Sequence, residues 1–193
     1  PKAQGILRER QEGLLKTLIE FDKLAKKYNI EYWLDFGTLL GSYRHLGFVP
    51  WDDDIDISMT DENLNKLLEI SKNPELKITL SAQYGNDKGS LWFFNNIHGG
   101  FDIFSHICTN TEKHNDFMYY MKYWSGTKKL KYFRDKRYNY LDSIKISSCG
   151  NIGENHVIVM RNISTNNVDN IYNSFFKASD IYPLAKGKFE DYE

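Results

Sequence analysis

Residues 33–57 read WLDFGTLLGSYRHLGFVPWDDDIDI, and the acidic end of this stretch carries the strongest structural signal in the chain. Asp54 and Asp56 alternate with isoleucines, which is the pattern of a strand with one polar and one apolar face. Both carboxylates are therefore expected on the same face of a strand over 54–59. Carboxylates this close repel each other, and a cation between them relieves the repulsion.

A third carboxylate stands in an otherwise apolar stretch further along the chain. Asp102 is the only carboxylate in a strand expected over 101–107, where an unpaired negative charge is unfavourable. Oxygen ligands of this kind suit Mg²⁺ or Mn²⁺, which keep open positions for substrate phosphates. The sequence therefore predicts a metal site formed by Asp54, Asp56 and Asp102, with Asp52 as a further ligand or a supporting carboxylate.

Two glycine-containing pairs lie between a strand expected over 30–36 and the acidic strand. Gly37-Thr38 and Gly41-Ser42 surround the start of a short helix expected over 39–44. Glycine lets the backbone approach a phosphate closely, and N–H groups at a helix start hold anionic oxygens. The candidate substrate-binding residues are accordingly Gly37, Thr38, Gly41 and Ser42, with Arg44 as a bidentate phosphate clamp and His45 as a weaker candidate.

Each of these assignments has a plainer structural alternative. The aspartates at 52–56 would form a solvated acidic turn, and residues 37–42 would be an ordinary strand-to-helix turn. Arg44 would be a surface arginine on a short helix. Trp33 and Trp51 are most simply core aromatics.

Hydrophobic periodicity predicts the remaining elements. Helices are expected over 6–28, from a cap at Thr60 or Asp61 to residue 70, and over 168–178. Further strands are expected over 76–82, 90–97, 143–149, 156–161 and 185–192. This order indicates an α+β protein, with a mixed β-sheet flanked by helices and a long N-terminal helix, in a single domain over 1–193.

The composition excludes several broad classes of function. A net charge of -1 over 193 residues gives no overall attraction to nucleic acid. The apolar runs are too short for a membrane span. Cys108 and Cys149 are the only cysteines and make no disulfide framework, which weakly favours a reducing compartment. The bias toward Lys, Asn, Ile and Tyr suggests a bacterial protein in the cytoplasm; in a eukaryote the Golgi lumen is expected.

Residues 33–57 closely resemble the signature of the LicD family, a branch of the DNA-polymerase-beta-like nucleotidyltransferases that includes the fukutin proteins. Residues 101–104, Phe-Asp-Ile-Phe, resemble the second motif of the family, with Ser105 where a proline is usual. Residues 182–184 and 189–192 resemble a third, weaker block. The resemblance implies a nucleotidyltransferase fold. Family members continue past this block, so it also implies that the chain is truncated at its C-terminus.

The same resemblance implies a phosphotransferase of the CDP-alcohol type. Such an enzyme moves phosphocholine or a related phospho-alcohol from a CDP-activated donor, typically CDP-choline, to a glycan hydroxyl of lipopolysaccharide or teichoic acid. In-line displacement at phosphorus needs a metal that neutralises charge on the pyrophosphate, and CMP is released. Asp54 and Asp56 would be the main ligands, and Asp102 a ligand or the base that takes the proton of the acceptor hydroxyl. CDP-ethanolamine, CDP-ribitol and CDP-glycerol present the same pyrophosphate, so the donor alcohol stays open.

Two other functions explain the D-x-D sequence less well. A glycosyltransferase would hold a nucleotide-sugar through Mn²⁺, but that fold usually places a longer nucleotide-binding half before its D-x-D. A calcium-binding loop starting at Asp52 needs glycine at its sixth position and glutamate at its twelfth, where Ile57 and Asn63 stand. The basic and aromatic stretch 119–137 is either a surface for an anionic or sugar acceptor or a solvated helix face.

Overall fold

The computed structural model describes residues 2–82, 91–95, 99–110, 112, 156–161 and 175–193. The helices in this part of the chain are α1 (Gly5–Tyr28), α2 (Phe36–His45), α3 (Asp61–Ile70), the 3-10 helix η1 (Pro74–Leu76) and α6 (Ala178–Ile181). The strands are β1 (Trp33–Leu34), β2 (Asp56–Thr60), β3 (Ile78–Ala82), β4 (Leu91–Asn95), β5 (Gly99–Asn110), β6 (His156–Arg161) and β7 (Phe175–Lys177).

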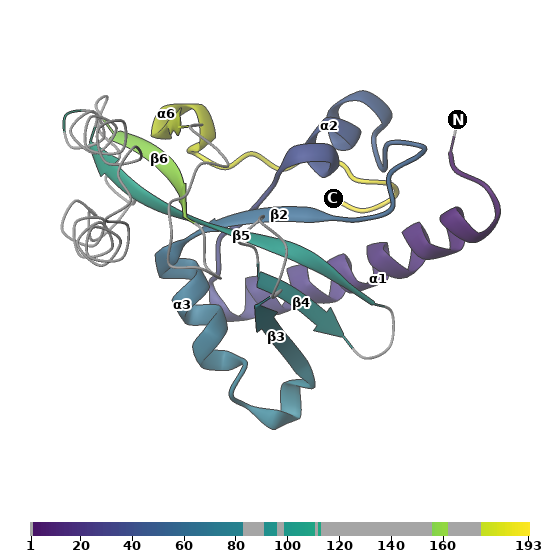
Figure 1. Cartoon of the computed structure of the whole chain (residues 1–193), viewed down its shortest axis with the longest axis horizontal. Coiled ribbons are helices and arrows are strands. Elements are labelled where there is room, and N and C mark those ends of the chain that lie inside the picture. Colours follow the sequence, from purple (N-terminus) through teal and green to yellow (C-terminus); the bar gives the residue numbers. More distant parts are fainter. Residues whose placement is uncertain (1, 83–90, 96–98, 111, 113–155, 162–174) are drawn as a thin grey trace, which may run out of the picture.

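These strands form one mixed sheet with the order β1-β2-β5-β4-β3 (Figure 1). The sheet continues through β6, which pairs with residues 105–110 of β5, and through β7, which pairs with β6. β2 and β5 run parallel, while the other strand pairs that the structure describes are antiparallel. In the parallel pair Asp56 stands directly opposite Asp102. The combination of helices with a mixed sheet and the long N-terminal helix were both predicted, and both are confirmed.

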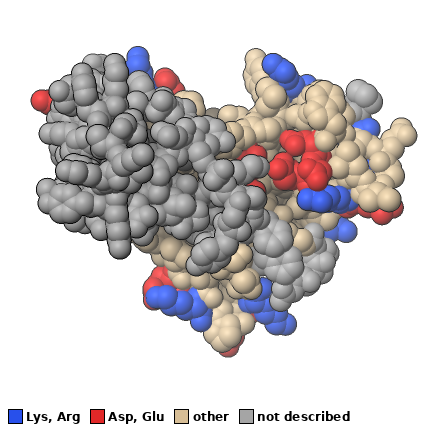
Figure 2. Space-filling model, in the orientation of Figure 1, with Lys and Arg blue, Asp and Glu red and all other residues tan. Residues whose placement is uncertain are grey.

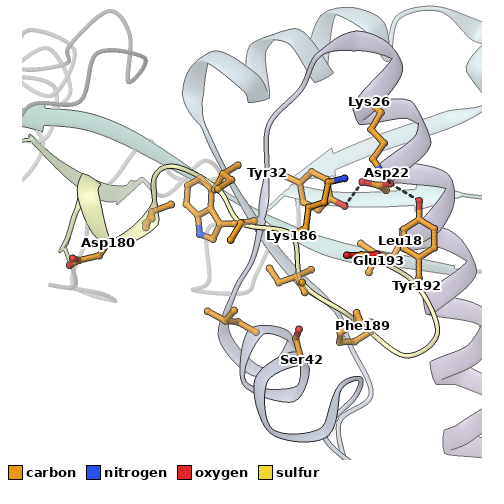
Figure 3. A pocket seen from close by; sticks show the side chains of 17 residues that line it. Leu18, Asp22, Lys26, Tyr32, Ser42, Asp180, Lys186, Phe189, Tyr192 and Glu193 are labelled. Carbon is orange, nitrogen blue, oxygen red and sulfur yellow. Dashed lines mark hydrogen bonds and ion pairs between the residues drawn. The ribbon is translucent and has the colours of Figure 1, made fainter.

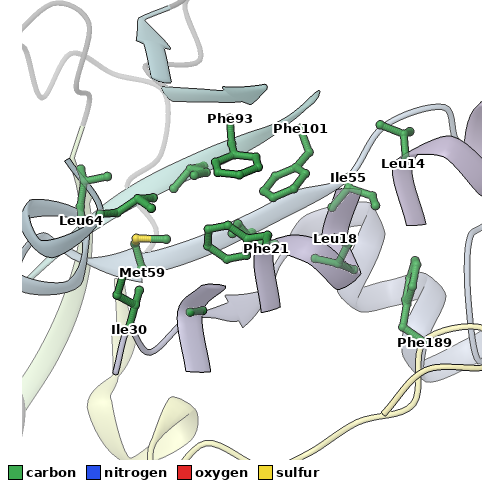
Figure 4. Close-up of a cluster of buried hydrophobic side chains, with 14 of the residues drawn as sticks. Leu14, Leu18, Phe21, Ile30, Ile55, Met59, Leu64, Phe93, Phe101 and Phe189 are labelled. Carbon is green, nitrogen blue, oxygen red and sulfur yellow. The ribbon is translucent and has the colours of Figure 1, made fainter. Parts of the chain in front are cut away.

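One face of the sheet is apolar and is covered by α1 and α3. Buried side chains of β2 and β5, such as Ile57 and Ile103, meet a stripe along α1 that includes Leu18 and Phe21 (Figure 4). The ring of Phe21 is fully buried and makes edge contacts with Phe93, Phe101 and Tyr32 at centroid distances of 5.1, 5.4 and 5.1 Å. Burial of large side chains on this face supplies the main favourable term in folding.

The opposite face of the same strands is polar near the start of β2 and aromatic further along. Asp56 and Asp102 lie at its acidic end, and α2 packs over it through the Phe36 ring on Phe104 at 4.8 Å. Further along, the buried imidazole of His106 lies 5.2 Å from the ring of Trp33. Side chains alternate between the two faces of β2 and β5, so the apolar face forms the core and the opposite face carries Asp56 and Asp102.

Several predicted boundaries need correction. The strand expected over 30–36 is reduced to two residues, because Asp35 leaves the sheet to cap α2. The helix expected over 39–44 begins earlier, at Phe36, and ends at His45. Thr60 is the residue that caps α3, as one of the two expected alternatives. The strand 143–149 lies outside the described residues.

Two predictions near the C-terminus are wrong. Within the helix expected over 168–178, residues 175–177 form a strand paired with β6, so sheet pairing overrides the helical pattern there. The strand expected over 185–192 is an irregular segment with a tight turn bridged between Phe189 and Tyr192. Glu190 has φ 56°, a left-handed conformation that a strand does not accommodate.

Cys108 is buried in β5 and is disulfide-bonded, which removes the argument from cysteine usage for a reducing compartment. Trp51 is 78% exposed, so the expectation that it belongs to the core is also wrong. Among the described helices, none is both long and apolar enough to cross a membrane.

The buried imidazole makes stability depend on pH. Burial lowers the pKa of His106 to about 4, below its usual 6.5, and the charges of Asp35 and Asp61 offset this only in part. The unfolded chain then binds the extra proton between those values, so the free energy of unfolding should fall as the pH drops from 6.5 to 4. We expect a loss of about 3 kcal/mol at most from this group.

Urea unfolding of the wild type and of His106→Leu at pH 7 and pH 4.5 measures this loss. The variant should lose less stability than the wild type between the two pH values, since acidic groups elsewhere contribute equally to both proteins. Equal losses would show that the imidazole is not the cause.

Candidate active site

Three carboxylates meet where β2 and β5 lie side by side. Asp54 precedes β2, Asp56 begins it, and Asp102 is the facing residue of β5. One oxygen from each carboxylate lies within 4.8 Å of the others. Asp56 is buried, while Asp54 and Asp102 are partly exposed. Figure 2 shows a group of acidic side chains on this side of the molecule. The structure brings the three predicted carboxylates together, and their role as metal ligands stays a prediction.

The backbone at Asp56 is held from two sides. Its N–H donates to the hydroxyl of Thr38 in α2 at 2.9 Å, and its carbonyl accepts from the N–H of Asp35 at 3.1 Å. The N–H of Asp102 donates to the carbonyl of Ile55 at 3.0 Å and begins the parallel ladder. These bonds fix the start of β2 against both α2 and β5. The backbone positions of Asp56 and Asp102 are therefore held close together.

Asp35 fixes the N-terminus of α2 over this site. Its carboxylate accepts from the N–H of Phe36 at 2.8 Å, and its other oxygen accepts from the hydroxyl of Ser58 at 2.6 Å. Ser58 lies in β2, two residues beyond Asp56, so a single side chain ties the helix cap to the acidic strand. Asp35 is therefore a structural residue here.

The carboxylate of Asp52 lies against the first turn of α2. A Cβ atom at Gly37 would stand 2.5 Å from Oδ2 of Asp52, so glycine is needed at this position to leave room for the carboxylate. Burial, together with the charge of the neighbouring Asp54, raises the pKa of Asp52 to about 6. Asp52, Asp53 and Asp54 also come close enough together to hold a cation. The excess of negative charge favours binding a cation at this end of the sheet.

Side chains of α1 hold the acidic loop by its carbonyl groups. Gln11 is fully buried and donates through Nε2 to the carbonyl of Asp52 at 2.8 Å, and Arg10 donates to that of Asp53 at 2.6 Å. With the carbonyls turned toward α1, the carboxylates of Asp52 and Asp54 are left to face the site. This role of Gln11 and Arg10 was not predicted from the sequence. The available signal was a glutamine on the apolar stripe of the helix, three residues before Leu14.

Other predicted substrate-binding residues lie elsewhere on α2. Gly41 packs against the following loop, and a Cβ there would stand 2.9 Å from the N–H nitrogen of Val49. Ser42 donates to the carbonyl of Lys188 at 2.9 Å and lines a cavity of about 390 Å³ between α1, α2 and the C-terminal segment (Figure 3). Arg44 and His45 are exposed in the last turn of α2, about 10 Å along the helix axis from Gly37. Their roles in substrate binding stay predictions.

The donor set is chemically suited to a small divalent cation. Opposite ligands of Mg²⁺ lie about 4.1 Å apart in an octahedral site, so oxygens spaced within 4.8 Å need only small side-chain movements to bind one ion. All three donors are carboxylates, which are hard ligands. Asp54, Asp56 and Asp102 therefore fit Mg²⁺ or Mn²⁺.

A known protein family matches the part of the chain that contains these three carboxylates. The family described as LicD/FKTN/FKRP, nucleotidyltransferase domain, matches residues 29–147, which include α2, β2 and β5. The chain belongs to this family. The resemblance inferred from residues 33–57 is thereby confirmed, and the clustered carboxylates lie inside the LicD-family domain.

Individual relatives match shorter parts of the chain. The lipopolysaccharide cholinephosphotransferase LicD of Haemophilus influenzae is 44% identical over 93 residues, which are 45% of this chain and 35% of that protein. An uncharacterized protein of Rickettsia typhi is 39% identical over 62 residues, 32% of this chain and 20% of its own length. The human ribitol 5-phosphate transferase FKRP is 29% identical over 63 residues, 33% of this chain and 12% of its own. The chain thus spans about a third of the LicD relative and less of the other two.

Residues 189–192, part of the third and weaker block of the LicD-family resemblance, pack on the loop that leads to the acidic residues, and the N–H of Glu190 donates to the carbonyl of Leu46 at 2.6 Å. The basic stretch 119–137, interpreted from the sequence as either an acceptor surface or a solvated helix face, lies outside the described residues.

Gly37→Ala tests the close packing of Asp52 on α2. Alanine favours a helix, so the fold should be kept, while the new methyl group must displace the Asp52 carboxylate. We expect Mn²⁺ to bind about tenfold more weakly, measured by titration calorimetry. Gly187→Ala is the matched control, because a Cβ there has no neighbour nearer than 3.7 Å. Unchanged affinity in Gly37→Ala would show that Asp52 takes no part in cation binding.

Proposed function

We propose that this chain carries the active site of a metal-dependent phosphotransferase, which moves phosphocholine or a related phospho-alcohol from a CDP-activated donor to a glycan hydroxyl. The observation that carries the proposal is the meeting of Asp54, Asp56 and Asp102 beside the first turn of α2. The site combines ligands for a cation with the N-terminus of a helix, and both stabilise a pyrophosphate. The names of the two transferase relatives, which describe transfer of cholinephosphate and of ribitol 5-phosphate, support this choice of substrate class.

Mg²⁺ or Mn²⁺ is the proposed cofactor, and when bound it would neutralise charge on the donor pyrophosphate. Asp54, Asp56 and Asp102 would hold it, and Asp52 would contribute a nearby negative charge or a further oxygen. The hydrogen bonds of Thr38 and Asp35 to the backbone of Asp56 would keep these ligands in place before the substrate arrives.

The proposed reaction is a single displacement at phosphorus. An acceptor hydroxyl oxygen forms a bond to the phosphorus that carries the alcohol, while the bond from that phosphorus to the bridging oxygen breaks. CMP leaves with the electron pair of that bond. The proton of the hydroxyl passes to a carboxylate, for which we assign Asp102, which stands opposite Asp56 on β5.

Donor binding is assigned to α2. Gly37 and Thr38 lie in its first turn, next to the acidic cluster, and would present backbone N–H groups to the phosphates. Arg44 and His45 would bind donor oxygens further along the helix. For Gly41 and Ser42 the structure supplies packing contacts with the following loop and with the C-terminal segment, which support the shape of the site.

Asp54→Asn tests the metal site directly. Removing one charge from the cluster should abolish detectable Mn²⁺ binding and turnover together, while the circular dichroism spectrum stays that of the wild type. Glu75→Gln, at an exposed carboxylate of η1, is the control and should change neither quantity. An Asp54→Asn protein that binds Mn²⁺ like the wild type would exclude the assigned ligand set.

The donor is tested with a panel of CDP-choline, CDP-ethanolamine, CDP-ribitol and CDP-glycerol, each with Mg²⁺ or Mn²⁺ and a mixture of cell-surface glycans. We expect release of CMP, highest with CDP-choline, and loss of the signal when EDTA is added. Consumption of UDP-sugars with no CMP from any donor would replace the proposal with a glycosyltransferase.

A further inference from the structure

The segment Phe189-Glu190-Asp191-Tyr192 packs against the loop that precedes the acidic strand. We propose that this segment is a positioning element, in which the buried carboxylate of Glu190 sets the geometry of the cation site without touching the cation. The proposal rests on the metal site described above. The proposal gives a role to residues 189–192, which take no part in the reaction proposed above.

The carboxylate of Glu190 is buried among cationic and backbone donors. Arg8 of α1 donates to both of its oxygens at 3.1 Å, and Lys2 donates to Oε2 at 2.5 Å. The N–H of Phe48 donates to Oε1 at 3.4 Å. Only 3% of the Glu190 side chain is exposed, so one carboxylate joins the start of α1 to the loop after α2.

The backbone around this carboxylate adopts an uncommon conformation. Glu190 has φ 56° and Leu46 has φ 54°, and the N–H of Glu190 donates to the carbonyl of Leu46 at 2.6 Å. A Cβ at Gly47 would stand 2.6 Å from Oε1 of Glu190, so the loop after α2 and the C-terminal segment are in direct contact. Non-glycine residues in the left-handed region persist only where the surroundings hold them, and they concentrate at functional sites.

The contact continues to the acidic cluster through a short loop. Residues 46–51 lead from Leu46 to Asp52, and the ring of Phe48 packs on Phe189 at 4.9 Å. Gln11, one helical turn from Arg8, binds the carbonyl of Asp52. Gln11 of α1 therefore holds the Asp52 end of the loop directly, whereas the Leu46 end is held by Glu190, which Arg8 of α1 binds in turn.

A second anchor holds the other end of the segment. The hydroxyl of Tyr192 donates to Asp22 of α1 at 2.6 Å, and Tyr32 donates to the same carboxylate at 2.9 Å (Figure 3). Asp191, between the two anchored residues, is exposed. The segment thus presents Phe189, Glu190 and Tyr192 inward and Asp191 to solvent, which provides a neighbouring carboxylate without the proposed role.

Electrostatics make the charge of Glu190 necessary. Burial alone would raise its pKa, but hydrogen bonds from Arg8 and Lys2 outweigh burial and leave the pKa below its usual value. The ionised form is therefore the one that holds the loop. Glutamine has the same shape, but its NH₂ group would face a donor of Arg8 or Lys2, and the partly buried guanidinium of Arg8 would keep only the exposed Glu12 as its counter-charge.

The experiment compares Glu190→Gln with two controls in Mn²⁺ titrations followed by electron paramagnetic resonance, which counts bound ions without turnover. Asp191→Asn removes the exposed neighbouring charge. Leu67→Ala destabilises the fold from a fully buried position in α3, away from the loop. All proteins are measured at a temperature where circular dichroism shows each to be fully folded.

We expect Glu190→Gln to bind Mn²⁺ about tenfold more weakly, while Asp191→Asn and Leu67→Ala bind like the wild type. Wild-type affinity in Glu190→Gln would overturn the positioning role and leave the proposed function standing. An equal loss in Leu67→Ala would also overturn it, since affinity would then follow global stability. A wild type that binds no Mn²⁺ would overturn the metal site and this inference together.

Discussion

Parallel pairing of β2 with β5 places Asp56 opposite Asp102, and the rest of the site is built around that register. A shift of one residue would bring an isoleucine into the site and a carboxylate into the core, because side chains alternate between the two faces of a strand. The apolar face enforces the register. Ile57 and Ile103, paired in the next position along, are both fully buried against α1 and α3. The packing energy of the core therefore holds together two carboxylates that repel each other, and the proposed cation would offset the repulsion that remains.

The site and its supports use different atoms of the same short loop. Carboxylates of Asp52 and Asp54 face the first turn of α2 and the strand pair, whereas loop carbonyls accept hydrogen bonds from Gln11 and Arg10 on the opposite side. Arg10 also pairs with the carboxylate of Asp53 at 3.4 Å, so α1 neutralises that residue, while its bonds to the carbonyls leave Asp52 and Asp54 to face the site. The hydroxyl of Thr38 acts in the same way on the backbone of Asp56. Rigid placement before substrate binds is what a displacement at phosphorus requires of its protein.

Local pattern was enough to predict the acidic strand, the long first helix and Asp102 as the single carboxylate of an apolar strand. Each of these features is visible as alternating or helical periodicity within a few consecutive residues. The chemistry of the three carboxylates predicted that these parts meet, and the family signature added the expected fold and activity. The irregular course of residues 185–192 was mistaken for a strand, since its conformation is set by Arg8 and Leu46, residues more than 140 positions away. The phosphate-binding role of Gly37 and Gly41 stays a prediction, and the structure adds that each also makes room for neighbouring atoms of the protein. Such close approaches depend on tertiary geometry, and no local pattern contains them.

Helix α2 connects the acidic cluster with the C-terminal segment. Its first turn carries Thr38 and Gly37 against the acidic cluster, and its second turn carries Ser42 against the C-terminal segment. The loop that follows α2 then reaches Glu190 on one side and Asp52 on the other. Displacement of the C-terminal segment would therefore shift both ends of the loop with respect to β2. The carboxylates lie on two paired strands, but their positions also depend on residues near the two ends of the chain. Of these, Lys2 donates to Glu190 at 2.5 Å.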